Sequence, residues 1–189
     1  MQASSYTLRI GRVVRELPLF EVQPGLRIAV LNILGDVELA EEAAAGLAPR
    51  IAAHTPQVLM TPEAKSIPLV YALAQRLTLP YVVLRKTYKS YMGKALAATT
   101  TSITMGREQT LYLDQKDREL VNNARVALID DVISTGSTLV AMHEIVTRAA
   151  GQAVCEAAIC TEGEREDWKH VIALTHLPLF KTGGGAVAT

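Results

Sequence analysis

Several features are scarce in this chain of 189 residues, and each scarcity excludes a class of protein. Its 19 basic and 19 acidic residues cancel, so no overall positive field attracts nucleic acid. No apolar run approaches the roughly 18 residues that a membrane span needs. The N-terminal stretch, MQASSYTLRIGRVVRELPLF, lacks the apolar region of a secretion signal. We therefore expect a cytoplasmic protein that binds neither nucleic acid nor membranes.

Cysteine is also scarce, since Cys155 and Cys160 are the only two in the chain. They lie five positions apart in AVCEAAIC, a segment typical of a strand. Side chains at that spacing point to opposite faces of a strand and cannot easily pair. We expect two buried free thiols.

What the chain contains is an alternation of strand-like and helix-like segments. The alternation predicts an α/β fold with a mainly parallel sheet and helices on both faces, whose ligands lie at the carboxyl ends of the strands. The length suits a single domain over residues 1–181, followed by a flexible tail at 182–189. Pro49 is expected to end or kink the first helix. Strands are expected at 26–33, 58–60, 81–84, 126–131 and 153–160, and helices at 36–51, 66–77 and from 137 to a stop at Gly151.

One segment carries most of the functional information: residues 126–140, VALIDDVISTGSTLV. An apolar run ends in Asp130 and Asp131, whose carboxylates can accept hydrogen bonds from sugar hydroxyls at the edge of a sheet. A short loop of small hydroxyl residues and Gly136 then leads into a helix. Backbone N–H groups and the positive helix terminus at such a loop can hold a phosphate. A P-loop is excluded, because no G-x-x-x-x-G-K-[ST] sequence occurs.

This segment resembles the phosphoribosyl-pyrophosphate signature of the type I phosphoribosyltransferases, and the rest of the chain resembles the purine branch of that family. The resemblance implies the type I fold, with a small hood built from about residues 1–35 and 161–181. It makes Asp130 and Asp131 the catalytic pair on the ribose 2′- and 3′-hydroxyls. Taken alone, the same pattern also suits an ordinary sheet edge with two solvated acids and a capped helix. The resemblance assigns the 5′-phosphate to Ser134, Thr135, Gly136, Ser137 and Thr138.

A second segment, TPEAKSIP at 61–68, follows the expected strand at 58–60. A tight strand-to-helix loop can present several N–H groups to one anion, and Lys65 adds a positive charge. The segment resembles the pyrophosphate-binding loop of purine phosphoribosyltransferases, in which a non-proline peptide is sometimes cis. Ser66 replaces the usual glycine. An ordinary helix start is the alternative reading; the resemblance makes the pyrophosphate ligands Glu63, Ala64, Lys65 and Ser66.

The third segment, RKTYKSYMGK at 85–94, has four cations and no acid. Cations of this kind bind a diphosphate and stabilise the charge that develops on it as it leaves. Arg85 and Lys86 resemble the R-K pair of adenine and xanthine phosphoribosyltransferases, and Lys89 is a further pyrophosphate candidate. A solvated basic loop is the alternative.

Residues 95–113 predict a hairpin, with strands at 99–104 and 110–113 around Gly106. In the family, a mobile hairpin at this place closes over the reacting centre and excludes water. This chain has Met-Gly-Arg-Glu at 105–108 where adenine-type enzymes have Glu-Tyr-Gly. Arg107 and Glu108 are therefore candidates for general acid–base catalysis. The alternative is that they are ordinary surface charges on a turn.

The base is harder to predict than the sugar. Residues 21–26, EVQPGL, resemble the start of the adenine-type hood, whereas TPEA at 61–64 is closer to xanthine-type enzymes. We expect adenine first and xanthine second. Asn32 and Trp168 are candidate base contacts, although ordinary packing or capping would explain either residue.

The resemblance implies a Mg²⁺-dependent glycosyltransferase of purine salvage. It would transfer the 5-phosphoribosyl group from phosphoribosyl pyrophosphate (PRPP) to a purine base, with Mg²⁺ held mainly by substrate and water and by no direct protein ligand. A homodimer is expected, with Tyr88, Tyr91 and Met92 as candidate contacts. The alternative is a non-catalytic regulator that senses PRPP. A repressor of that kind would need a DNA-reading element, and the segment before residue 26 is too short and too poor in basic residues for one.

Overall fold

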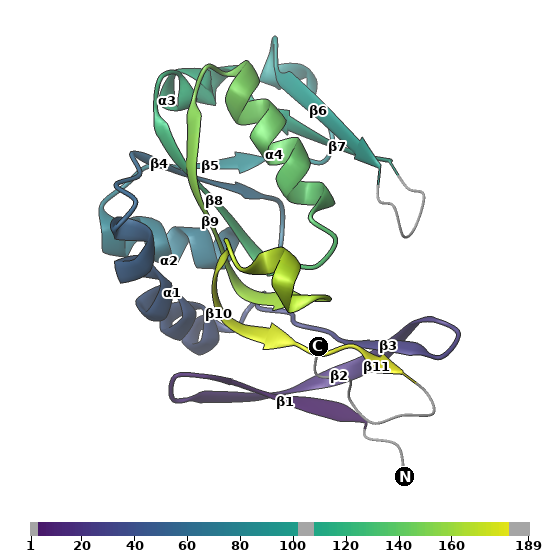
Figure 1. Ribbon diagram of the computed structural model, residues 1–189. Coiled ribbons are helices and arrows are strands. Elements are labelled where there is room, and N and C mark those ends of the chain that lie inside the picture. The colour runs from purple at the N-terminus through teal and green to yellow at the C-terminus, as the bar shows by residue number, and fades with distance from the viewer. Residues whose placement is uncertain (1–3, 102–107, 182–189) are drawn as a thin grey trace.

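A five-stranded parallel sheet forms the centre of the computed structural model, which describes residues 4–101 and 108–181 (Figure 1). Its strand order is β10-β9-β8-β4-β5. All of its neighbouring pairs are parallel, so the carboxyl ends of its strands share one edge. The strands are β4 (Val58–Pro62), β5 (Tyr81–Leu84), β8 (Arg125–Ile133), β9 (Gln152–Glu162) and β10 (Ile172–Leu177).

Helices α1 (Val37–Ala52) and α2 (Ile67–Leu77) pack on one face of this sheet, as Figure 1 shows. Helix α4 (Ser137–Arg148) and the hairpin of β6 (Leu96–Thr101) and β7 (Glu108–Leu113) pack on the other. Neighbouring residues of β8 serve different cores, since Ile129 contributes to the first and Leu128 to the second. The α/β fold with helices on both faces is therefore confirmed.

A second, antiparallel sheet forms the hood at the edge of the molecule. Its order is β1-β2-β3-β11, so it joins the two terminal parts of the described chain. Apolar side chains of its hairpin, such as Leu8 and Ile10, complete the core beneath α1. The strands are β1 (Ser5–Ile10), β2 (Val13–Gln23), β3 (Leu26–Ala29) and β11 (Phe180–Lys181).

The prediction for residues 26–33 was wrong in two respects. The strand ends at Ala29, and it pairs antiparallel with β2 and β11 in the hood instead of entering the parallel sheet. The following residues are apolar because Leu31 and Ile33 are buried in a loop, at 2% and 0% exposure. Burial alone does not distinguish a loop under the core from a buried strand.

The other predicted elements are present. Asp36 caps α1 by accepting a hydrogen bond from Leu39 N at 3.1 Å. Helix α1 continues three residues past Pro49, so of the two predicted effects, a stop or a kink, the stop at this residue does not occur; at the last turn a proline removes only one hydrogen bond. Helix α4 ends at Arg148, before the predicted stop at Gly151, and Ala150 takes a positive φ of 59°.

Both cysteines are free, as predicted; Cys160 is buried and Cys155 is half-buried. The hairpin was predicted, but Thr104, Gly106 and Arg107 lie outside the described residues, as does the tail at 182–189. Among the described residues, no helix has the length and apolar character to span a membrane. The short helices are η1 (Ser90–Met92), η2 (Gln115–Asp117), α3 (Arg118–Val121) and η3 (Arg165–Trp168).

Candidate functional site

The loops that follow β4, β5, β8 and β9 meet at the carboxyl edge of the parallel sheet. Open α/β sheets bind their ligands at this edge. Three of the loops contain the residues predicted to contact PRPP: 63–66 after β4, 85–86 after β5 and 134–138 after β8. Segments separated by up to 70 residues in sequence are thus brought to one place.

The two acids at the end of β8 are almost completely buried, each with 7% exposure. The Asp131 N–H donates to Asp130 Oδ1 at 2.9 Å. Burial, and next the neighbouring Asp131 carboxylate, raise the pKa of Asp130 above its usual range. Asp131 Oδ2 is buried and accepts no hydrogen bond within the described part of the chain. A buried carboxylate oxygen of this kind is suited to accept a hydrogen bond from a hydroxyl group of a ligand.

The loop from Ser134 to Thr138 curls around a small hollow of about 40 Å³ at the start of α4. Its residues contain no charged side chain. The hydroxyls of Thr135 and Ser137 lie 3.0 Å apart, and Gly136 turns the chain with a φ of +72°. Helix α4 has no side-chain cap, so its first N–H groups remain available to an anion. The hollow thus has hydroxyl and N–H donors and no cation, and Asp130 also lines it; we call it the phosphate cradle after its predicted role.

The loop after β4 crosses from the Asp pair to the hood. Lys65 Nζ donates to Leu31 O at 3.2 Å and lies 3.5 Å from Asp131 Oδ2. The Ser66 hydroxyl donates to Pro62 O at 3.0 Å in place of capping α2. The peptide bond between Glu63 and Ala64 is cis, as it sometimes is in the loop that this segment resembles. Lys65 thus lies beside the acids predicted to contact the ribose.

The loop after β5 is joined to the loop after β4 by one carboxylate. Glu63 accepts a hydrogen bond from Arg85 Nε at 2.5 Å and one from Lys86 N at 2.7 Å. Hydrogen bonding to Glu63 is the main cause that raises the pKa of Arg85. This bond holds Arg85, which is only partly exposed, against the loop that follows β4. The structure thus brings together all but one of the predicted pyrophosphate residues.

Lys89 is the exception, since it lies further along the loop, where its backbone precedes η1. Its N–H donates to Met92 Sδ at 3.3 Å. Met92 is fully buried, so the prediction that it contacts a second subunit was wrong. Tyr88 and Tyr91 are exposed, and Tyr91 also approaches Arg85 Nη1 at 3.5 Å.

The two residues predicted for the base have local structural roles. Asn32 Oδ1 accepts from Leu34 N at 3.2 Å, which closes a turn after the hood strand. Trp168 lies against the phosphate cradle, where its ring would be 2.8 Å from a Cβ placed on Gly136. Its indole N–H donates to Glu162 O at 2.8 Å. Their contact with a base stays a prediction.

Glu162 was missed by the sequence reasoning, although it ends β9 at the same edge. It is 8% exposed, and burial raises its pKa to about 7. A glutamate at the end of a strand suits a solvated loop, so the only signal in the sequence was its place two residues beyond a buried apolar run.

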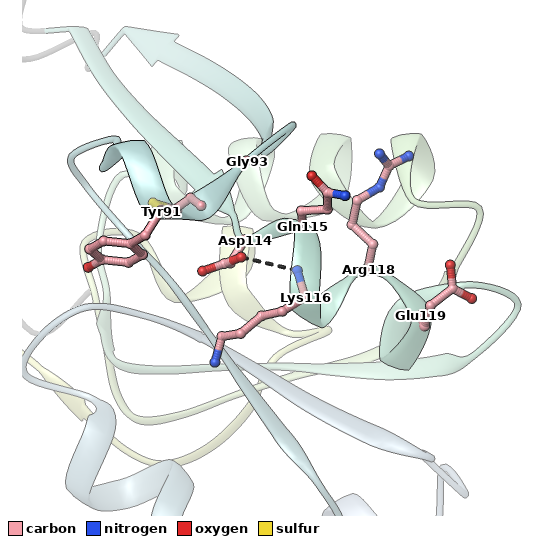
Figure 2. A pocket seen from close by; sticks show the side chains of 8 residues that line it. Tyr91, Gly93, Asp114, Gln115, Lys116, Arg118 and Glu119 are labelled. Carbon is pink, nitrogen blue, oxygen red and sulfur yellow. Dashed lines mark hydrogen bonds between the residues drawn. The ribbon is translucent and has the colours of Figure 1, made fainter.

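A larger hollow of about 650 Å³ lies elsewhere, between η1 and the η2–α3 turn (Figure 2). Tyr91 is on one side of it and Arg118 and Glu119 are on the other. Its buried acid, Asp114, already has a structural role, because its side chain caps η2 by accepting a hydrogen bond from Lys116 N at 3.1 Å. Within residues 4–101 and 108–181, no group of three His, Cys, Asp or Glu side chains is arranged to hold a metal. The hollow is therefore a weaker candidate than the sheet edge.

Comparison with known proteins identifies the family of the chain. The family model described as the phosphoribosyl transferase domain matches residues 31–176. A hypoxanthine/guanine phosphoribosyltransferase of Methanocaldococcus jannaschii is 33% identical over 106 residues, which cover 56% of this chain and 54% of the relative. The purine biosynthesis transcriptional repressor of Bacillus subtilis is 31% identical over 125 residues, covering 66% of this chain and 43% of the relative. The chain thus spans about half the length of these relatives.

Adenine phosphoribosyltransferases are similar over more of the chain. The one from Synechococcus sp. is 28% identical over 154 residues, covering 81% of this chain and 83% of the relative. The solved structure from Thermoanaerobacter pseudethanolicus has a TM-score of 0.63 at 18% identity and covers 92% of this chain and 95% of its own. At 18% identity, the similarity to this solved structure is evidence for the fold alone. Together with the match over residues 31–176, these likenesses show that the chain belongs to the phosphoribosyl transferase domain family.

Proposed function

We propose that this protein is a Mg²⁺-dependent purine phosphoribosyltransferase. It transfers the 5-phosphoribosyl group from PRPP to a purine base, adenine first and xanthine second, and releases pyrophosphate. The observation that carries the proposal is the buried Asp130–Asp131 pair beside the uncharged cradle at the start of α4. Carboxylates that can bind the two ribose hydroxyls, next to a loop that can bind a phosphate, match a ribose that carries a 5′-phosphate.

The pyrophosphate end of PRPP fits the cations after β4 and β5. Lys65 and Arg85 are held beside carboxylates, at 3.5 Å from Asp131 and 2.5 Å from Glu63. A diphosphate has more charge than either carboxylate, so these cations can exchange their partners for it when the substrate binds. Their charge then stabilises the diphosphate as it leaves.

In the proposed reaction, a ring nitrogen of the base donates an electron pair to C1 of the ribose. The bond between C1 and the pyrophosphate oxygen breaks, pyrophosphate leaves with that electron pair, and the ring N–H proton is released. The main contribution of the protein to the rate is to position the reactants, because the cradle and the Asp pair hold the sugar while the base approaches. The Asp pair lies in β8, and the cradle is the short loop between β8 and the first turn of α4.

Mg²⁺ fits this site as part of the substrate. The ion would be held chiefly by phosphate oxygens and water, with the buried carboxylates of Asp130 and Asp131 nearby. When bound, Mg²⁺ neutralises charge on the diphosphate.

Turnover with a panel of bases tests the proposal. Purified protein is incubated with PRPP, Mg²⁺ and, separately, adenine, hypoxanthine, guanine, xanthine, orotate or uracil, and nucleotide and pyrophosphate are followed by chromatography. Turnover of a purine with equal yields of the two products is expected. Turnover of orotate or uracil alone would contradict the purine assignment.

A PRPP sensor is the second candidate, and the likeness to the Bacillus subtilis repressor favours keeping it. Residues 5–23 form the hood strands β1 and β2 here, so this stretch does not form a DNA-reading helix. Tight calorimetric binding of PRPP without turnover of any base would establish the sensor. A homodimer, with the exposed Tyr88 and Tyr91 at its contact, is also a proposal.

A further inference from the structure

The order of the strands predicts the side from which the base approaches. The loops proposed for pyrophosphate follow β4 and β5, on one side of β8, whereas β9 lies on the other side. A nucleophile that displaces a leaving group must attack C1 from the opposite direction. If PRPP lies across the end of β8, its base partner enters over the end of β9. Glu162 is the last residue of that strand.

The side chain of Glu162 lies on the face of the sheet that the hood and α1 cover. Its partner in the parallel pairing of β9 with β10 is Leu177, which is fully buried in the core beneath the hood and α1. Cys160, two residues before Glu162, packs in the core beneath the hood. Burial raises the pKa of Cys160, and the nearby Asp131 and Glu162 carboxylates raise it further.

The carboxyl of Glu162 is buried without a partner to neutralise it. No ion pair or side-chain hydrogen bond joins it to residues 4–101 or 108–181, although its exposure is 8%. Its backbone, in contrast, is fixed, because the carbonyl accepts from the Trp168 indole. Gly163 follows with a φ of +95° and faces the backbone of Ser134 in the phosphate cradle. The end of β9 is thus fixed beside the loop proposed to bind the phosphate, and no described side chain forms a hydrogen bond with the Glu162 carboxyl.

We propose that Glu162 is a specificity-determining residue that reads the six-membered ring of the base as a neutral carboxylic acid. The inference rests on the phosphoribosyl transfer proposed above. The neutral acid donates one hydrogen bond and accepts one. Its complement is a base edge with a donor beside an acceptor, such as the 6-amino group and N1 of adenine or N1–H and O6 of a 6-oxopurine. Burial without a cation favours this uncharged form.

Two substitutions distinguish the neutral acid from other roles. Glu162→Gln keeps one donor and one acceptor in the same shape, so kcat/KM for the preferred purine should stay within about threefold of wild type. Glu162→Met keeps the volume and removes both hydrogen bonds, and kcat/KM for the base should fall by about 10- to 100-fold. The KM for PRPP should not change in either variant. Glu164→Gln, an exposed neighbour, is the matched control.

Unsubstituted purine, which lacks the group at position 6, separates contact with the base from a structural effect. Wild type should prefer its natural base over unsubstituted purine, and this preference should shrink at least fivefold in Glu162→Met. Equal loss in Glu162→Gln and Glu162→Met would overturn the neutral acid, and an unchanged preference in Glu162→Met would overturn the contact. If wild type turns over no base at all, the transferase itself is contradicted, so the two failures are distinguishable.

Discussion

The cradle after β8 and the paired loops after β4 and β5 would bind opposite ends of PRPP, and they differ in chemistry. The cradle has five residues without charge, placed at a helix start. The paired loops contain Glu63, Lys65, Arg85 and Lys86, and their cations already have carboxylate partners. A phosphate that stays bound through the reaction suits preformed N–H donors. A diphosphate that must leave suits cations that can return to an internal partner.

The two regions also differ in how far they could be predicted. The cradle lies in one continuous segment, where strand, acids, glycine and helix follow in order, so the sequence alone indicated its parts and their roles. The Glu63–Arg85 pair joins two loops 22 residues apart, and only the pairing of β4 with β5 brings them together. The placement of Trp168 against Gly136 likewise depends on contacts across the fold.

The hood and the end of β9 were the least predictable parts. The segment 26–33 is mostly apolar, so its pattern did not reveal that four residues form a strand and that Leu31 and Ile33 are buried in the loop after it. Glu162 was missed because burial of a strand end depends on the hood above it, which is built from both terminal regions. Patterns within one element predict that element, whereas burial by distant segments requires the structure.

Removing the charge of the Asp130–Asp131 pair should weaken binding of the ribose part of PRPP more than any other change. The double change Asp130→Asn and Asp131→Asn removes charge-assisted hydrogen bonds to two hydroxyls, and PRPP affinity should fall by at least about a hundredfold. The fold should persist, because an amide relieves the burial of charge. Calorimetry measures the affinity, and Asp117→Asn, which lies in η2, is the control. Unchanged affinity would refute the assignment of the pair.

A methyl group on Gly136 of the cradle should weaken PRPP binding less than the loss of the two carboxylates. Gly136→Ala strains a residue with φ of +72° and pushes against Trp168, so the free energy of unfolding should fall by about 1–3 kcal/mol and PRPP affinity about tenfold. Denaturant unfolding and calorimetry measure both. Trp168 is the only tryptophan of the chain, so its fluorescence should also change when PRPP binds wild type. Adding Trp168→Ala should remove the steric part of the loss; no relief would contradict the contact.

Removing one cation should affect only the pyrophosphate end. In Arg85→Gln, pyrophosphate and PRPP should bind roughly tenfold more weakly, because one charge-assisted contact is lost. Arg76→Gln is the control, since Arg76 pairs with Glu41 on the outer helices. Equal weakening in both variants would show that only overall charge matters.

Glu162 should affect stability in a way that depends on pH. Its folded pKa of about 7 lies above the ordinary 4.5, so folding takes up a proton and the stability of the neutral carboxyl is lost as pH rises between these values. Glu162→Gln should therefore match wild type near pH 4 and be more stable at pH 8. A pH-independent difference in unfolding free energy would contradict the raised pKa.

Binding of the two halves of PRPP tests the division of the site most directly. Ribose 5-phosphate and pyrophosphate are titrated separately, by displacement of PRPP in a calorimeter, into wild type, Gly136→Ala and Arg85→Gln. We predict that Gly136→Ala weakens ribose 5-phosphate and leaves pyrophosphate unchanged, and that Arg85→Gln does the reverse. Equal weakening of both ligands in both variants would contradict two separate binding regions.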